Sequence, residues 1–235
     1  MFSPWRGALP DRAAEAGPRA VVFDLDGVIV ESEGVWDAAR RALVEERGGR
    51  WTEGATRDML GMSSPEWSRY VHEELGVDLD PEEIAERVVA EVLARYRRSL
   101  PLLPGAVQAV RALAARWPLG LASSSNRQVI EAVLSLAGLE ECFAVTVSSE
   151  EVAAGKPAPD VYLAAASRLG VPPASAVAIE DSANGLSSAR AAGMLVIAVP
   201  NREFPPPADA LKQAALVLGS LAELTPEAIA AIQRP

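Results

Sequence analysis

Short runs of apolar residues alternate with amphipathic stretches along most of the chain. The apolar runs end in Gly, Pro or polar residues and have the length of buried strands. They lie at residues 21–23, 119–122, 143–147, 176–179 and 194–199, with 216–218 as a candidate sixth. The stretches between them have helical spacing, as in residues 160–169 and 183–192. Strands that alternate with helices predict a parallel sheet joined by right-handed crossovers.

One block, residues 34–100, breaks this alternation, because no segment in it has the pattern of a strand. Apolar residues at helical spacing indicate a helix with Ser64 as its N-cap, and Asp80 opens a second helix. We therefore predict the α/β fold class, a Rossmann-like doubly wound parallel sheet with an inserted helical cap domain. The predicted parts are a flexible N-terminal tail at 1–18, a core domain of 19–33 and 101–235, and the cap at 34–100.

Composition narrows the choice of partners and compartment. The chain has 235 residues, a net charge of −10 and a pI near 4.8. Nucleic acids and anionic membranes attract basic surfaces, so we expect neither as a partner. Cys142 is the single cysteine, which rules out an intrachain disulfide and fits a reducing compartment. Residues 1–18 do not have the pattern of a signal peptide, and no apolar run approaches the roughly 20 residues of a membrane span. We expect a cytoplasmic protein.

Polar side chains suited to phosphate or metal chemistry follow four of the predicted strands. They are Asp24 and Asp26, Ser123, Lys156, and Glu180 with Asp181. The carboxyl ends of parallel strands meet at one edge of a sheet, so these groups are expected to converge. Carboxylates suit a hard cation such as Mg²⁺, whereas a lysine and a hydroxyl bind phosphoryl oxygens. This set predicts phosphoryl transfer with a carboxylate as the nucleophile.

Each of these groups by itself has an ordinary structural explanation. An Asp-x-Asp pair after a strand is commonly a turn or a helix cap, and serines commonly cap helices. A Gly-Lys-Pro segment reads as a turn beside a solvated lysine, and Glu180-Asp181 as an acidic loop. Chance does not explain four such groups that follow predicted strands in this order. The combination therefore indicates an active site.

The same residues resemble the four motifs of the haloacid dehalogenase superfamily. The matching segments are FDLDGV at residues 23–28, LASSS at 121–125, GKPAPD at 155–160 and IEDSANG at 179–185. The resemblance covers roughly residues 19–230 and is closest to the branch of β-phosphoglucomutase-like enzymes and sugar-phosphate phosphatases. In that branch a helical cap is inserted after the first motif. A dehalogenase is not expected, because the dehalogenase branch lacks the second aspartate, which is present here as Asp26.

This resemblance implies catalytic roles for the matching residues. Asp24 would be the nucleophile, and Asp26 would protonate the leaving oxygen and later activate water. Ser123 would bind a phosphoryl oxygen. Lys156 would bridge the nucleophile and the phosphate, oriented with the help of Asn184.

The resemblance also implies a cofactor and a substrate pocket. The cofactor is Mg²⁺, held by Asp24, the Asp26 carbonyl and Asp181, with Glu180 as a further acid in the metal set. Gly27 supports this arrangement by letting the chain turn after the first strand. The substrate-binding candidates are Ser124, Ser125, Asn126, Trp36, Gly61 and Met62.

Two activities stay open within this branch. The β-phosphoglucomutases carry a histidine where this chain has Trp36, and a cap arginine just after a Gly-x-Ser segment, where this chain has Ser64. A bisphosphate intermediate would lack its anchors here, so we expect a phosphatase that acts on a sugar phosphate, resembling the 2-deoxyglucose-6-phosphate type. A phosphosugar mutase is the alternative. The expected partner is a small phosphate ester, and the expected state is a monomer, with a homodimer as the other option.

Overall fold

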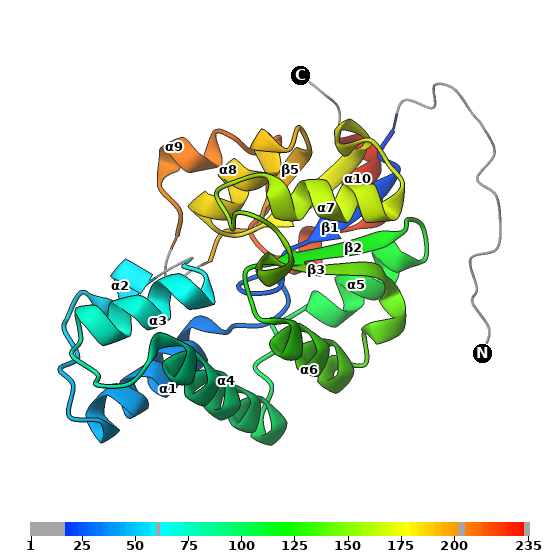
Figure 1. Cartoon of the computed structure of the whole chain (residues 1–235). Coiled ribbons are helices and arrows are strands. Elements are labelled where there is room, and N and C mark those ends of the chain that lie inside the picture. Colours follow the sequence, from blue (N-terminus) through cyan, green and yellow to red (C-terminus); the bar gives the residue numbers. More distant parts are fainter. Residues whose placement is uncertain (1–16, 60–61, 202–204, 233–235) are drawn as a thin grey trace.

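The structure is a computed structural model that describes residues 17–59, 62–201 and 205–232. Figure 1 shows a sheet flanked by helices and, beside it, a group of helices from the first part of the chain. Most of the tail expected at residues 1–18 lies outside the described residues. In the described part of the chain, no helix is long and apolar enough to cross a membrane.

Six parallel strands form the sheet within the described residues, in the order β3-β2-β1-β4-β5-β6. The strands are β1 (Ala20–Phe23), β2 (Leu119–Ser123), β3 (Phe143–Ser148), β4 (Ala176–Glu180), β5 (Leu195–Ala198) and β6 (Leu216–Val217). All strand pairs are parallel, so every carboxyl end points the same way. The predicted α/β class is confirmed. The reversal of strand order on either side of β1 places the end of β1 where doubly wound folds bind ligands.

Alternating side chains of β1 pack into two separate hydrophobic cores. Val21 and Phe23 pack in one apolar cluster, whereas Ala20 and Val22 pack in the other. This is the period of two expected for a strand buried on both faces. Helices cover both faces (Figure 1). They are α5 (Ala106–Ala114), α6 (Arg127–Ala137) and α10 (Pro226–Ala231) on the first cluster, and α7 (Asp160–Leu169), α8 (Ala183–Ala191) and α9 (Ala208–Leu211) on the second.

The inserted block contains the helices α1 (Glu33–Glu46), α2 (Ala55–Met59), α3 (Ser64–Glu73) and α4 (Pro81–Arg98). Helix α4 packs against both α1 and α3. Asp80 caps α4 as predicted, since its carboxylate accepts the Glu82 backbone N–H. The predicted cap of α3 is wrong by one residue. Ser63 is the N-cap, because it exchanges hydrogen bonds with Glu66, and Ser64 is the first helical residue.

Two linkers join this block to the sheet and run side by side. The Glu31 N–H donates to the Pro101 carbonyl, and the Leu103 N–H donates to the Ile29 carbonyl. An antiparallel bridge between Val30 and Leu102 lies between these bonds. The block therefore begins and ends beside the carboxyl end of β1, so its helices lie next to the strand-end residues.

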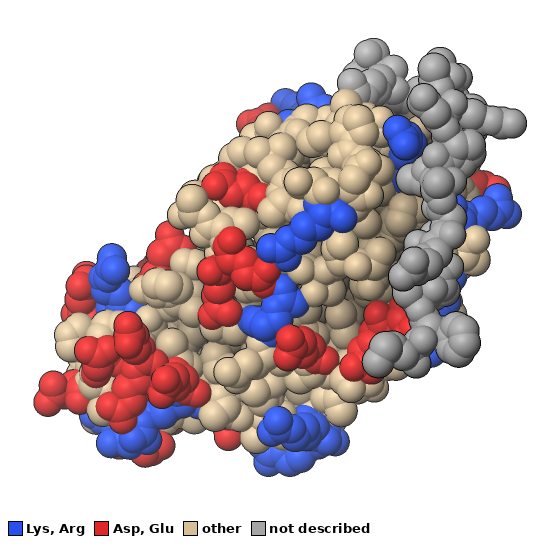
Figure 2. Space-filling view, turned by 45° about the vertical axis from the view of Figure 1, so that its right-hand side comes forward, with Lys and Arg blue, Asp and Glu red and all other residues tan. Residues whose placement is uncertain are grey.

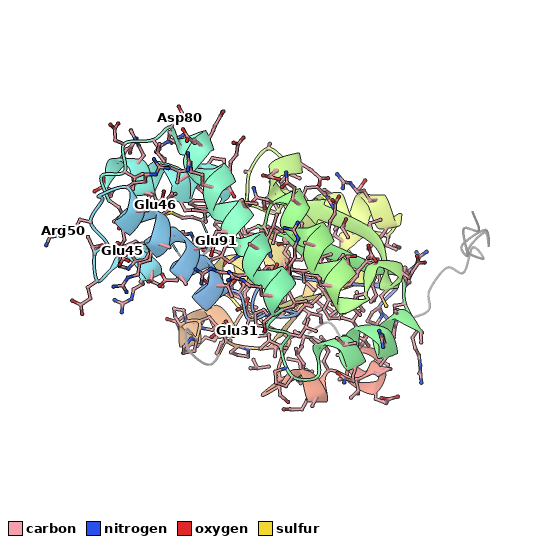
Figure 3. All side chains as sticks on the ribbon, turned by 90° about the horizontal axis from the view of Figure 1, so that it is seen from below. Glu31, Glu45, Glu46, Arg50, Asp80 and Glu91 are labelled. Atoms are coloured by element: carbon pink, nitrogen blue, oxygen red, sulfur yellow. The ribbon has the colours of Figure 1, made fainter. Side chains whose placement is uncertain are left out.

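Charged side chains cover the outer faces of the cap helices. Glu45 and Glu46 project from the far end of α1, while Glu31 lies in the linker (Figure 3). In Figure 2, Lys and Arg are interspersed with Asp and Glu over the visible face and form no continuous basic surface there. The inner face of α1 is buried and holds Trp36 and Arg40.

Candidate active site

Asp24 directly follows the last residue of β1 and is buried. Its backbone N–H donates to the Ile179 carbonyl of β4, so the hydrogen bonds between β1 and β4 continue as far as Asp24. The chain then turns at Gly27, which has a φ of 75°. A Cβ on Gly27 would lie 1.9 Å from the Asp181 carboxylate, so glycine is required both by the turn and by this close approach.

Lys156 lies between two carboxylates. Its Nζ is 2.8 Å from Asp24 Oδ1 and 2.7 Å from Glu180 Oε1, and its side chain is 4% exposed. The ammonium also lies 5.1 Å from the centre of the Tyr162 ring. Although burial opposes its charge, the two carboxylates raise the pKa of Lys156. It is therefore a fixed positive charge beside Asp24.

Both oxygens of the Glu180 carboxylate already accept hydrogen bonds. Oε1 accepts from the Tyr162 hydroxyl at 2.6 Å and from Lys156, while Oε2 accepts from the Asp181 N–H and from Ser182. The side chain is fully buried, and a Cβ on Gly185 would lie 1.9 Å from it. These contacts make Glu180 the anchor of Lys156.

Three buried acids crowd this edge of the sheet. One carboxylate oxygen from each of Asp24, Glu180 and Asp181 lies within 4.8 Å of the others. Burial, opposed by Lys156 and reinforced by the other acids, raises the pKa of Asp24 to about 8. Burial and the Glu180 and Asp24 charges also raise the pKa of Asp181. One ammonium does not balance these acids. A hard cation with oxygen ligands fits the remaining negative charge, so the donor set suits Mg²⁺.

Replacing Gly27 with alanine tests the close approach to Asp181. We expect Gly27→Ala to lower the free energy of unfolding by about 3 kcal/mol and to weaken Mg²⁺ binding, because the new Cβ displaces the carboxylate. Gly48 has a similar φ of 70° and nothing within 4 Å of its Cβ position, so Gly48→Ala measures the backbone strain alone. We expect that control to lose only about 1 kcal/mol in urea denaturation. Equal losses for the two variants would contradict the steric argument.

Asp26 is held by two serines from the end of β2. Ser125 Oγ donates to Asp26 Oδ2 at 2.8 Å, and Ser123 Oγ lies 3.3 Å from the same oxygen. The Ser125 backbone N–H in turn donates to Ser123 Oγ. Asp26 Oδ1 is buried and accepts no hydrogen bond from the described residues. Because Asp26 lines the cavity, this oxygen is available to a bound ligand.

A cavity of about 550 Å³ lies between the sheet and the cap. This volume suits a small organic ligand. Asp24, Asp26, Lys156 and Asp181 line it, together with the predicted substrate-binding residues Ser124, Ser125, Asn126, Trp36 and Met62. The cap and the core meet at its edge, where Ser64 Oγ donates to Asn126 Oδ1 at 2.9 Å.

The remaining predicted residues lie outside the cavity wall or lack the expected contact. Ser123 and Glu180 do not line the cavity and support groups that do. Asn184 lines it, but no hydrogen bond between Asn184 and Lys156 is present among the described contacts. Gly61 lies outside the described residues.

Sequence reasoning missed Arg40, which also lines the cavity. It lies four positions after Trp36 on the buried face of α1. A charged residue within an apolar helical stripe was the available signal. Trp67 of α3 is buried and lines the cavity as well.

Comparisons with known proteins find similar hydrolases. Residues 18–193 match the family profile of haloacid dehalogenase-like hydrolases. Hexitol phosphatase B of Escherichia coli K12 is 35% identical over 198 residues, which cover 78% of this chain and 84% of that protein.

Solved structures with the same fold extend the comparison. CbbY from Rhodobacter sphaeroides, in complex with phosphate, has a TM-score of 0.81 and 28% identity, covering 90% of this chain and 99% of that one. β-Phosphoglucomutase from Clostridium difficile has a TM-score of 0.75 and 25% identity, covering 90% of this chain and 95% of that one.

Proposed function

Because the chain belongs to the haloacid dehalogenase-like hydrolases, we propose that it is a Mg²⁺-dependent phosphatase of a small sugar phosphate. The observation that carries this proposal is the buried contact of Lys156 with Asp24, beside Asp181, in the wall of one cavity. The similarity to hexitol phosphatase B supports a sugar or sugar alcohol phosphate as the substrate.

In the proposed mechanism Asp24 attacks the phosphorus of the ester. A bond forms between the Asp24 carboxylate and phosphorus while the bond from phosphorus to the ester oxygen breaks. Asp26 gives its proton to that leaving oxygen. Asp26 then takes a proton from the water that attacks the aspartyl phosphate, which releases inorganic phosphate and restores Asp24. Ser125 holds Asp26 in place, and Lys156 stabilises the negative charge of the phosphoryl oxygens.

The residues that would hold the metal are the Asp24 and Asp181 carboxylates and the Asp26 backbone carbonyl. We assign Glu180 to holding Lys156 rather than to holding the metal, because both of its carboxylate oxygens accept hydrogen bonds from the protein. Bound Mg²⁺ supplies charge neutralisation at the phosphoryl oxygens. In its absence the crowded acids repel an anionic substrate.

Phosphate release from p-nitrophenyl phosphate tests the proposal. We expect hydrolysis with Mg²⁺ and a loss of more than about 100-fold with EDTA, restored by added Mg²⁺, because the buried acids need a cation to accept the phosphate dianion. A panel of hexose and hexitol phosphates, phosphoglycolate and nucleoside monophosphates then ranks the substrates by kcat/KM. No release from any ester, or a rate that EDTA leaves unchanged, would refute the proposal.

A phosphosugar mutase is the second candidate. The structural similarity to β-phosphoglucomutase and the presence of Arg40 in the cavity favour it. An assay of β-glucose 1-phosphate with a glucose 1,6-bisphosphate activator separates the two activities. A phosphatase releases inorganic phosphate, whereas a mutase forms glucose 6-phosphate.

A further inference from the structure

Arg40 is a buried charge enclosed by two aromatic rings. It belongs to α1 and is 7% exposed. The guanidinium carbon lies 5.2 Å from the centre of the Trp36 ring and 5.0 Å from that of the Trp67 ring. Cation–π contact with both rings stabilises the charge and fixes the orientation of the side chain. Trp36 comes from the same helix and Trp67 comes from α3, so the enclosure exists only when these helices pack together.

The Nε atom of this guanidinium is buried and has no hydrogen-bond acceptor among the described residues. None of the described residues forms an ion pair with the group. An arginine has five N–H donors, which lie in the plane of its guanidinium. The aromatic rings do not supply hydrogen-bond acceptors for these donors. Burial lowers the pKa of Arg40 to about 10, although the charges of Glu33, Asp37 and Asp26 oppose that shift. A buried charge without hydrogen bonds is costly, so a function at this position is the natural explanation.

Arg40 faces the same cavity as the candidate catalytic groups. The lining includes Arg40 and Arg57 from the cap and Asp24 with Lys156 from the core. A ligand whose phosphate lies beside Lys156 therefore extends, within one cavity, toward a second positive charge. The cavity's volume of about 550 Å³ is large enough for a phosphorylated six-carbon compound.

The charges of three acids act on Arg40, but none of the described acids forms an ion pair with it. Among the described residues of the inserted helices, Glu33 is the one acid that lines the cavity, together with Arg40 and Arg57. Burial, followed by the charge of Asp26, raises the pKa of Glu33 to about 7, so Glu33 neutralises Arg40 incompletely at neutral pH. The charges of Asp37 and Asp26 also act on the guanidinium, but the Asp37 carboxylate accepts a hydrogen bond from Thr56 and the Asp26 carboxylate accepts one from Ser125. Hydroxyl groups could accept single hydrogen bonds from Arg40 but would leave its charge unpaired. A carboxylate or a phosphate accepts two N–H donors at once and pairs the charge.

We propose that Arg40 binds a second anionic group of the substrate, a carboxylate or a phosphate, at the cap end of the cavity. The inference rests on the proposed function, because it takes the cavity to bind a phosphate ester. It narrows the substrate class to phosphorylated sugars or sugar derivatives that carry a further negative charge.

Matched substrates of equal length test this assignment. Sorbitol 6-phosphate carries one anionic group, 6-phosphogluconate adds a carboxylate, and fructose 1,6-bisphosphate adds a phosphate. We expect the protein to favour one or both two-anion substrates over sorbitol 6-phosphate in kcat/KM by at least about tenfold, because they pair the buried guanidinium. The better of the two identifies whether the group is a carboxylate or a phosphate.

Variants at two neighbouring arginines separate recognition from folding. We expect Arg40→Gln to lower kcat/KM for the two-anion substrates by about 100-fold, mainly through KM, and to leave sorbitol 6-phosphate within about threefold. Arg40→Lys keeps the charge but loses the planar fork, so an intermediate loss is expected. Arg41 is the matched control on the same helix, because it is exposed and paired with Glu45, and Arg41→Gln should leave every substrate unaffected.

Three results would overturn the assignment. Equal losses on all substrates in Arg40→Gln would make Arg40 a structural residue. A parent enzyme that prefers sorbitol 6-phosphate, with that preference lost in Arg40→Gln, would indicate hydroxyl recognition instead. If no ester is hydrolysed, the proposed function fails separately, and calorimetric binding of 6-phosphogluconate and fructose 1,6-bisphosphate decides the subsite. A weaker affinity of Arg40→Gln for either ligand supports the subsite, and equal affinities for both overturn it.

Discussion

Asp24→Asn is expected to reduce kcat by at least about 10⁴-fold, because the amide is too weak a nucleophile to attack phosphorus. The substitution is nearly isosteric, and Lys156 keeps its contact with Glu180. The protein should therefore stay folded and bind substrate while losing turnover.

Steady-state assays and circular dichroism check this expectation together. A parent-like melting curve with lost turnover supports the role of Asp24, and a rate within tenfold of the parent contradicts it. Asp209→Asn is the matched control, since Asp209 is exposed and pairs with Lys212 on the surface. Asp26→Asn should slow both formation and hydrolysis of the phosphorylated intermediate, which single-turnover measurements resolve.

Lys156→Met is expected to lower the free energy of unfolding by about 3–5 kcal/mol, because it removes the cation from a buried group of acids. Glu180 is fully buried and would keep its hydrogen bonds from Tyr162 and Ser182 but lose its counter-charge. Turnover should also be lost, because Asp24 and the phosphoryl oxygens would have no ammonium beside them. Lys212→Met removes an exposed lysine and should change stability by less than about 0.5 kcal/mol.

The stability that Lys156→Met loses should depend on pH, and the direction of this dependence follows from the pKa of Asp24. The pKa of Asp24 is raised by burial to about 8, above its value of 3.8 in the unfolded chain, so the folded state holds this proton as the pH rises toward 8. Lys156 lowers that pKa, and its removal raises it further. Above pH 8, Asp24 ionises beside Lys156 in the parent but has no counter-charge in the variant. The stability deficit in EDTA should therefore widen between pH 8 and 9.5, and a deficit that narrows there would contradict the ion pair.

The order of elements could be read from the sequence because it depends on local patterns. The apolar runs before Asp24, Ser123 and Glu180 have the period and length of buried strands, and the structure forms strands at each of them. Parallel topology then brings their carboxyl ends to one edge, so the meeting of Asp24 and Asp181 follows from motif order. Boundaries depend on single hydrogen bonds, which is why Ser63 rather than Ser64 caps α3.

The α/β sheet, the block of helices after the first strand and the positions of the acids after the strands could all be predicted from short segments, because periodicity is a local property. The pairing of these side chains could not, because it depends on how distant segments pack. Glu180 holds Lys156 because β4 brings it against the loop before α7, and Arg40 faces the cavity because α1 and α3 enclose it between Trp36 and Trp67. Such pairings depend on contacts between segments far apart in the chain, and no local pattern encodes them.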